Sequence, residues 1–257
     1  MEFVIIAIAA FATAILTFFS GFGLGTILTP VFAVFFPIDQ AIALTGVVHF
    51  ANNIYKLTLV GKNADWRILL RFGSAAVVFA FLGAWVLLNV SDLDPLFSYD
   101  FNGNIKEITP VKLVISALLI VFALMDLVPF FGKLKIDEKW LPVGGVLSGF
   151  FGGLSGHQGA LRSAFLIKAG LSKEVFVGTG VVIGCFIDFT RISVYATRFN
   201  SSDLIDNLPI VVTATLAAIL GAFIGNKLLK KVTISFLQKF IAIGLILISI
   251  ALGTGII

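Results

Sequence analysis

Long apolar runs, each near or above the roughly 20-residue length at which a helix crosses a bilayer, most constrain how this chain can fold. The runs cover approximately residues 3–36, 40–60, 65–90, 111–131, 140–168, 173–196, 205–228 and 236–257. Lipid offers the backbone no hydrogen-bond partners, so open strands are excluded and each run predicts helix. The sequence therefore predicts an all-α protein that crosses a membrane several times.

The composition excludes a soluble globular domain. Apolar residues make up 59% of the chain and charged residues 12%, whereas a soluble domain carries about 25% charged residues. The net charge of +4 is spread over short loops, which argues against a nucleic-acid surface. Cys185 is the single cysteine, so no intramolecular disulfide or CxxC metal site is expected. Within its apolar run we interpret Cys185 as a small buried side chain rather than a reactive thiol.

The first and fifth runs are longer than one crossing needs, and a glycine-rich stretch interrupts each of them. These stretches are SGFGLG at residues 20–25 and SGFFGGLSG at residues 148–156. Irregular backbone is tolerated in a membrane only where protein or a water-filled cavity covers it, so both runs predict helical hairpins whose breaks form a transport site. The alternative is close helix packing through the GxxxG pairs Gly21/Gly25, Gly149/Gly153, Gly180/Gly184 and Gly221/Gly225, and packing is favoured for the last pair.

Loop charge predicts which side of the membrane each connection faces. The loops at 61–71, 132–139 and 227–233 are rich in Lys and Arg, so the positive-inside rule assigns them to the cytoplasm. The loops at 91–110 and 197–206 contain few Lys or Arg and are assigned to the outside. An even number of crossings then separates the basic loops. The first and fifth runs must therefore return to the side they left, and both termini are expected outside the cytoplasm.

The same count predicts two repeats of opposite orientation, an architecture that exposes one site alternately to either face. The first repeat covers residues 1–131 (hairpin 3–36, helices 40–60, 65–90 and 111–131), and the second covers residues 140–257 (hairpin 140–168, helices 173–196, 205–228 and 236–257). Short similarities support a duplication: Ser20-Gly21-Phe22 recurs as Ser148-Gly149-Phe150, Thr45-Gly46-Val47-Val48 recurs as Thr179-Gly180-Val181-Val182, and Asn53-x-x-Lys56 parallels Asp188-x-x-Arg191.

Paired glycine-rich hairpins, each followed by a helix with a threonine motif, resemble the TauE/SafE family, which is grouped with sulfite exporters and sulfonate permeases. The motifs are LTGVVHFANNIYK at residues 44–56 and GTGVVIGCFIDFTR at residues 178–191. The resemblance implies about eight membrane segments in a bacterial cytoplasmic membrane and transport of sulfur-containing anions such as sulfite or sulfoacetate. The chain departs from the usual family pattern at GHQGALRS, residues 156–163.

Polar residues within the apolar runs indicate where an anion would bind, because a central charge costs about 2.5–3.5 kcal/mol on insertion scales unless it faces a cavity or a partner. His49, Asn52, Asn53 and Lys56 follow helical spacing and can share one face. A face with a cation and hydrogen-bond donors suits an oxyanion. Lys56 lies near the cytoplasmic end of its run, where the alternative is that it snorkels to the surface.

Asp188, Arg191 and Tyr195 share a face of the sixth run in the same way. Asp188 and Arg191 either contact the anion or form a structural ion pair at i, i+3. In an inverted repeat Lys56 falls toward the cytoplasm and Arg191 toward the outside, so the two cations are also candidates for steering an anion into opposite mouths.

The break in the second hairpin predicts an anion site. A half-helix that begins near Gly156 presents free backbone N–H groups and its positive dipole end to the membrane interior. Gln158 is a donor, and Arg162 can hold a sulfonate-like oxyanion through two parallel hydrogen bonds, unless it pairs with Asp126 instead. His157, like His49, could carry a proton or be a neutral, hydrogen-bonded core residue.

Taken with the resemblance, these features predict a secondary transporter, specifically an exporter, that works by alternating access around a midplane site. The candidate substrate-binding residues are Ser20, Gly23, Gly25, His49, Asn52, Asn53, Ser155, Gly156, His157, Gln158, Arg162, Asp188 and Arg191, and the steering candidates are Lys56 and Arg191. No cofactor, metal or catalysis is expected, since HExxH, GxSxG and P-loop motifs are missing. The expected partners are a small anion and the lipid bilayer. A channel, a transporter of another small anion, a membrane-embedded enzyme and an assembly subunit are the alternatives.

Overall fold

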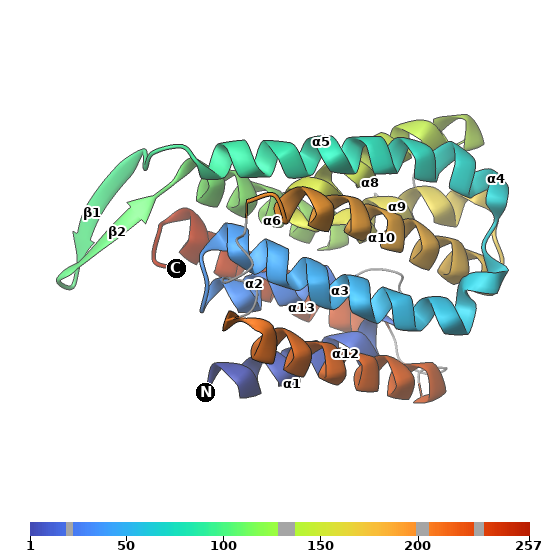
Figure 1. Cartoon of the computed structure of the whole chain (residues 1–257), viewed down its shortest axis with the longest axis horizontal. Helices are drawn as coiled ribbons and strands as arrows, with labels where there is room; N and C mark the ends of the chain where they lie inside the picture. The colour runs from blue at the N-terminus through green and yellow to red at the C-terminus, as the bar shows by residue number, and fades with distance from the viewer. Residues whose placement is uncertain (19–22, 128–136, 199–205, 229–233) are drawn as a thin grey trace.

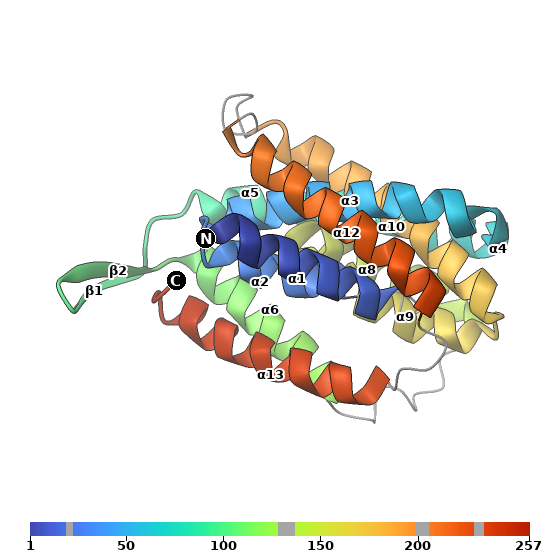
Figure 2. The same ribbon diagram turned by 90° about the horizontal axis from the view of Figure 1, so that it is seen from below.

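The computed structural model describes residues 1–18, 23–127, 137–198, 206–228 and 234–257. It is an elongated bundle of helices that run roughly along one axis (Figure 1). Both chain termini lie at the same end of the bundle, next to a projecting β-hairpin, and Figure 2 shows the same arrangement from a perpendicular direction. We call this end the termini end.

The helices follow one another in two groups. The first group is α1 (Glu2–Thr17), α2 (Leu24–Ala33), α3 (Ile38–Val60), a 3₁₀ turn at Gly61–Asn63, α4 (Trp66–Ile68), a π-helical turn at Leu69–Gly73, α5 (Ser74–Ser91) and α6 (Pro110–Leu127). The second group is a 3₁₀ turn at Glu138–Trp140, α8 (Leu141–Ser155), α9 (Gln158–Leu166), a 3₁₀ turn at Ile167–Ala169, α10 (Lys173–Tyr195), α12 (Leu208–Leu228) and α13 (Ile234–Gly253).

Local sequence signals explain where several helices begin. The Asp65 side chain accepts hydrogen bonds from the backbone N–H groups of Arg67 and Ile68, which caps the continuous helical segment formed by α4, the π-turn and α5. Ser172 caps α10 in the same way through the N–H of Val175. Pro110 starts α6, where its missing N–H leaves no hydrogen bond unmade.

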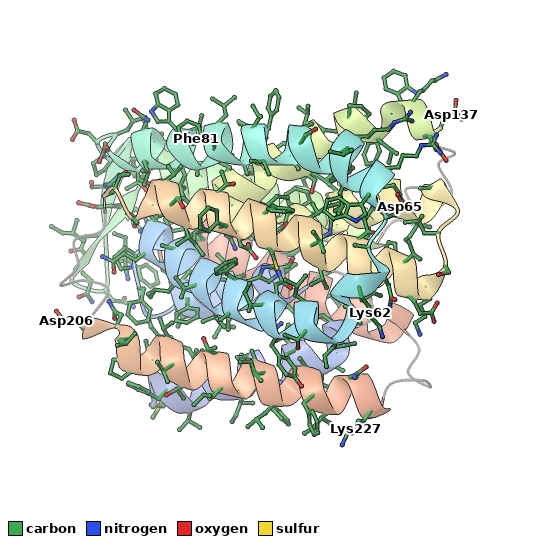
Figure 3. All side chains as sticks on the ribbon, turned by 45° about the vertical axis from the view of Figure 1, so that its right-hand side comes forward. Lys62, Asp65, Phe81, Asp137, Asp206 and Lys227 are labelled. Carbon is green, nitrogen blue, oxygen red and sulfur yellow. The ribbon has the colours of Figure 1, made fainter. Side chains whose placement is uncertain are left out.

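The structure is that of a helical membrane protein. Among the described residues, three helical segments are long and apolar enough to cross a bilayer, namely Trp66–Ser91, Lys173–Tyr195 and Leu208–Lys227. Apolar side chains cover the outside of the bundle, as Figure 3 shows for Phe81 of α5, which is 57% exposed. Lipid rather than water suits such a surface. The shorter apolar helices are Glu2–Thr17, Leu24–Ala33, Pro110–Met125 and Ala242–Gly253.

The glycines of α8 correct the position of the second predicted break. Residues 148–155 of the expected glycine-rich break are helical, and the helix ends only at Gly156, which has a φ of +81°. A Cβ added to Gly149 or Gly153 would lie 2.1 or 2.0 Å from a backbone oxygen of the segment that contains α5. These glycines therefore serve close packing of α8 on α5, which the GxxxG alternative predicted.

Gly221 and Gly225 also support the packing prediction. A Cβ on Gly221 of α12 would lie 2.3 Å from the carbonyl oxygen of Phe11, and one on Gly225 would lie 2.8 Å from that of Ile15. Both oxygens belong to α1, so α12 and α1 approach closely along their length. This contact confirms the interpretation favoured from the sequence for the Gly221/Gly225 pair.

The connection at 91–110 contains a β-hairpin that the sequence analysis did not predict. Strands β1 (Phe97–Phe101) and β2 (Asn104–Ile108) pair antiparallel, from Phe97 opposite Ile108 to Phe101 opposite Asn104. The turn residues Asn102 and Gly103 both have positive φ, at 56° and 79°, as a two-residue hairpin turn requires. The hydroxyl of Tyr99 donates to the carbonyl oxygen of Thr254 at 2.6 Å, which ties β1 to the C-terminal segment.

The opposite end of the bundle carries Lys62, Asp65, Asp137 and Lys227, whereas Asp206 lies at the termini end (Figure 3). We call the end that carries Lys62 and Lys227 the lysine end. Two of the loops that are predicted to be cytoplasmic thus contribute lysines to the same end. Lys133 and Lys135 of the third basic loop lie outside the described residues.

Candidate functional site

The two helix breaks contact each other inside the bundle. Between α1 and α2 the chain passes Gly23, which has a φ of +121°, and between α8 and α9 it turns at Gly156. A Cβ added to Gly25 would lie 3.2 Å from the carbonyl oxygen of Gly156, and one added to Gly156 would lie 3.8 Å from the hydroxyl oxygen of Thr29. The beginning of α2 therefore packs directly against the turn of the second hairpin. Ser20 of the candidate set lies outside the described residues.

Asp188 of α10 is the centre of a buried polar network. Its Oδ2 atom is 2.6 Å from Nδ1 of His49 and accepts a hydrogen bond from Nδ2 of Asn53 at 3.0 Å. Its Oδ1 atom accepts from Nε2 of Gln158 at 2.9 Å and from Nε of Arg191 at 3.0 Å. The carboxylate thus joins α3, α9 and α10 and has four polar partners. Its pairing with Arg191 confirms the i, i+3 ion pair weighed from the sequence.

The guanidinium of Arg191 lies against two glycines. A Cβ on Gly46 would lie 3.3 Å from its Cζ, and a Cβ on Gly156 would lie 2.8 Å from its Nη1. Arg191 is 0% exposed; its Nη2 lies 2.9 Å from Oδ1 of Asp188, whereas its Nη1 has no hydrogen-bond acceptor among the described residues. The expectation that Arg191 stands at an outer mouth is therefore wrong, since this side chain is fully buried beside the break. A buried guanidinium nitrogen without an acceptor is costly, and an anion would supply one.

Arg162 of α9 joins the same network through Gln158. Its Nη1 donates to Oε1 of Gln158 at 2.9 Å, so Gln158 bridges Arg162 and Asp188. A Cβ on Gly184 would lie 3.2 Å from Nη1 of Arg162 and 3.0 Å from Nδ2 of Asn53, so Gly184 borders the network rather than serving only to pack helices. The side chain of Asp126, the alternative partner predicted for Arg162, lies outside the described residues.

Lys56 of α3 is buried instead of reaching the surface. It is 7% exposed, and its Nζ lies 5.3 Å from the centre of the Phe18 ring. It also lies close enough to Arg162 for the two charges to interact. The snorkelling alternative is therefore wrong for Lys56, which is a buried cation like Arg162 and Arg191.

The described contacts of His157 are with Ser155 and Phe122. Its Nδ1 atom lies 2.9 Å from the carbonyl oxygen and 3.2 Å from the hydroxyl of Ser155, and its ring stacks on Phe122 of α6 at 5.4 Å between centroids. The contact between Ser155 and His157 thus stabilises the turn between α8 and α9, and the His157 ring connects this turn to α6. The hydrogen-bonded core interpretation of His157 agrees with this position.

Three further buried polar residues belong to α2 and α3. Both polar atoms of the Asn52 amide, and the hydroxyls of Thr29 and Thr45, have no hydrogen-bond partner among the described residues. Asn52 was a sequence candidate, but Thr29 and Thr45 were not. The available signals were the position of Thr29 directly before Pro30 and that of Thr45 within the repeated Thr-Gly-Val-Val motif. Ser148 was also missed, and its hydroxyl donates to the carbonyl oxygen of Gln158 at 2.8 Å.

Buried cations outnumber buried carboxylates among the described side chains of the site. Lys56, Arg162 and Arg191 are buried cations, whereas Asp188 is the one buried carboxylate among the described side chains. No cluster of His, Cys, Asp and Glu suited to a metal ion occurs among the described residues. The arrangement can therefore hold an anion through guanidinium, amide and hydroxyl donors.

Comparison with protein families gives one match. The family described as sulfite exporter TauE/SafE matches residues 6–252, which is nearly the whole chain. No curated protein and no solved structure gave a match.

Proposed function

The chain belongs to the sulfite exporter TauE/SafE family, and we propose that it exports a small sulfur-containing anion, such as sulfite or an organosulfonate, by alternating access around the two helix breaks. The family and the apolar helices identify a membrane protein of the transporter type. The proposal adds the substrate class, the direction of transport, the site and the mechanism.

The observation that carries this proposal is the Arg191 guanidinium. It is fully buried at the contact between the two breaks, and although its Nη2 lies 2.9 Å from Oδ1 of Asp188, its Nη1 has no hydrogen-bond acceptor among the described residues. An oxyanion is the ligand class that fits, because its oxygens can accept the N–H groups that Nη1 of Arg191 presents beside Gly156. The Thr29 hydroxyl, which has no hydrogen-bond partner among the described residues and would lie 3.8 Å from a Cβ on Gly156, adds a further donor beside the break.

Asp188 is then a positioning residue rather than a substrate contact. Its two oxygens already have His49, Asn53, Gln158 and Arg191 as partners, and its negative charge would repel an anion. By accepting from Nε of Arg191, it fixes the orientation of the guanidinium and leaves Nη1 to face Gly156. Gln158 links Arg162 to the same carboxylate, so both arginines share one support.

The arrangement of the two helix pairs supports an inverted repeat. The α1–α2 pair begins at the termini end, whereas the α8–α9 pair begins just after Asp137 at the lysine end (Figures 1 and 3). Two hairpins that enter from opposite ends and meet at their breaks suit alternating access, because each can separate from the site toward its own side. We propose residues 1–131 and 140–257 as the two repeats.

Radiolabelled sulfite flux through purified protein in liposomes tests the function. We expect saturable flux that releases sulfite chemically unchanged. Arg191→Lys, which keeps the charge but loses the planar fork, should weaken the apparent affinity about ten- to a hundredfold, the value of a lost charge-assisted hydrogen bond. Arg67→Lys is the matched control, because Arg67 pairs with Glu138 where both side chains are largely exposed.

The outcomes separate the alternatives. An absence of sulfite flux and of sulfite binding would contradict the proposed function, and flux that never saturates would indicate a channel. Chemical conversion of sulfite would indicate an enzyme. Unchanged affinity in Arg191→Lys would remove Arg191 from the site while leaving transport itself intact.

A further inference from the structure

A narrow apolar groove lies between α1, α2 and α13. Its volume is about 260 Å³. All three helices contribute to its walls, among them Ala12 and Leu16 of α1, Ile27 and Val31 of α2, and Gly244 and Ile248 of α13. Thr13 carries the only polar side chain among the described residues that line it. The groove therefore offers a ligand apolar contacts and no charge.

The groove opens on the outer surface of the bundle. Ile8, which lines it, is 62% exposed, and Ile243 and Leu247, which flank Gly244 on α13, are 56% and 64% exposed. Figure 2 shows α13 at the edge of the bundle, where it lies along α6. Exposed apolar side chains on the outside of a helical membrane protein face lipid, so the groove is continuous with the hydrocarbon of the bilayer.

The groove reaches the backbone of α13. Nothing lies within 4 Å of a Cβ added to Gly244, so none of the described side chains fills the groove at this point. Helix bundles are close-packed, and atoms that line a gap lose the dispersion contacts that a neighbour would supply. An occupant that restores those contacts is therefore favoured.

The chemistry of the walls selects among possible occupants. Water and anions both need polar partners, which these walls do not provide. A helix of a second copy is about 10 Å across, so the volume of the groove would hold less than one turn of it. An acyl chain is a single carbon chain in width, and lipid tails surround the groove.

We propose that an acyl chain of a membrane phospholipid binds in this groove and packs α13 against α1 and α2. The groove recognises the tail, so phospholipids with different headgroups bind there. The tail contacts Ile27 and Val31 of α2, whereas Gly25 and Thr29 lie on the opposite face of that helix, beside the second break. The lipid site is thus separate from the proposed anion site, and either proposal can fail without the other.

Two substitutions at Gly244 provide the test. Gly244→Leu fills the groove, whereas Gly244→Ala removes the same glycine from the helix and adds only one methyl group, which makes it the matched control. The full chain is washed in detergent, and its melting temperature is measured with and without palmitoyl-oleoyl phosphatidylethanolamine or phosphatidylglycerol. Native mass spectrometry counts the phospholipids that each protein retains.

We expect either lipid to raise the melting temperature of the wild type and of Gly244→Ala equally, because a ligand that binds only the folded state stabilises it. Gly244→Leu should lose most of this shift and retain no phospholipid, since leucine occupies the place of the tail. Equal lipid-induced shifts in all three proteins would overturn the proposal. Pairs of chains in the wild type that separate in Gly244→Leu would show that a second copy fills the groove instead.

A measurement on the wild type decides the proposal even if Gly244→Leu does not fold. A phosphatidylethanolamine with a diazirine in its acyl chain is bound, the protein is washed in detergent, and the sample is irradiated. Cross-links to the segments of α1 and α13 that line the groove are expected. Absence of cross-links, or cross-links confined to exposed residues outside the groove such as Leu216 and Leu220 of α12, would contradict binding in the groove.

Discussion

Gly156 combines two properties that a residue with a side chain would lose. It has a φ of +81°, and it leaves space for Nη1 of Arg191, which would lie 2.8 Å from an added Cβ. We expect Gly156→Ala to weaken sulfite binding about tenfold or more, because Arg191 must move away from the break; overpacking of this kind costs about 1–3 kcal/mol. Binding is measured by ligand-induced thermal shift.

Gly170 supplies the control for this prediction. It also has a positive φ, +68°, but nothing lies within 4 Å of an added Cβ. Gly170→Ala should therefore cause only backbone strain, about 1–2 kcal/mol of stability, and leave sulfite binding unchanged. If the two variants lose affinity to the same extent, the effect of Gly156 is backbone strain and its contact with Arg191 does not matter.

The sequence predicts which residues of the site share a face of one helix, but not which residues they contact on other helices. Helical spacing correctly grouped His49, Asn53 and Lys56 on one buried face of α3, and it paired Asp188 with Arg191 on α10. Spacing along one helix contains no information about which helix packs opposite. The bonds from His49, Asn53 and Gln158 to Asp188 depend on that packing, and so does the contact of Arg191 with Gly156.

At the scale of helices, the glycines of α8 make a prediction about stability. A Cβ on Gly149 would lie 2.1 Å from the carbonyl oxygen of Ala76, so Gly149→Ala must push α8 away from the segment that contains α5. We expect a loss of about 1–3 kcal/mol, the usual cost of overpacking. The melting temperature in detergent measures it.

Gly244 of α13 is the matched control for Gly149. Nothing lies within 4 Å of a Cβ added there, and the backbone is helical. Gly244→Ala should leave the melting temperature unchanged or raise it, because alanine favours helix by up to about 1 kcal/mol over glycine. A melting temperature that falls equally in both variants would show that α8 and α5 do not depend on their close approach.

The elements themselves were predictable to different degrees. Apolar runs predicted the helices, but the exact break in the second hairpin did not follow from its glycines. Packing against α5 keeps residues 148–155 helical, and only Gly156 leaves the helix. The β-hairpin had a local signal, Asn102-Gly103, whose positive φ values fit a two-residue turn.

At the scale of the whole molecule, the order of helices agrees with what crossing parity required. The β-hairpin and both termini lie at one end, and Lys62, Asp137 and Lys227 lie at the other (Figures 1 and 3). Counting crossings needs only the number of runs and the parity of the hairpins, so it predicts this arrangement without knowledge of packing, and the eight-segment inverted repeat stays a prediction. Which end faces the cytoplasm depends on membrane insertion, and the positive-inside rule predicts that it is the lysine end.

Single-cysteine labelling in intact cells tests this orientation. Cys185 is first replaced by alanine, and Lys62→Cys, Asp137→Cys and Ser98→Cys are then introduced singly. Lys62 and Asp137 lie at the lysine end, and Ser98 is an exposed residue of β1 at the termini end. An impermeant thiol reagent should label only the cysteine at residue 98, and permeabilised cells should allow labelling of all three. Labelling at residues 62 and 137 with protection at residue 98 would mean that the termini face the cytoplasm. In that case the hairpin α1–α2 would open to the cytoplasm instead of the outside, and the two proposed access routes would exchange sides.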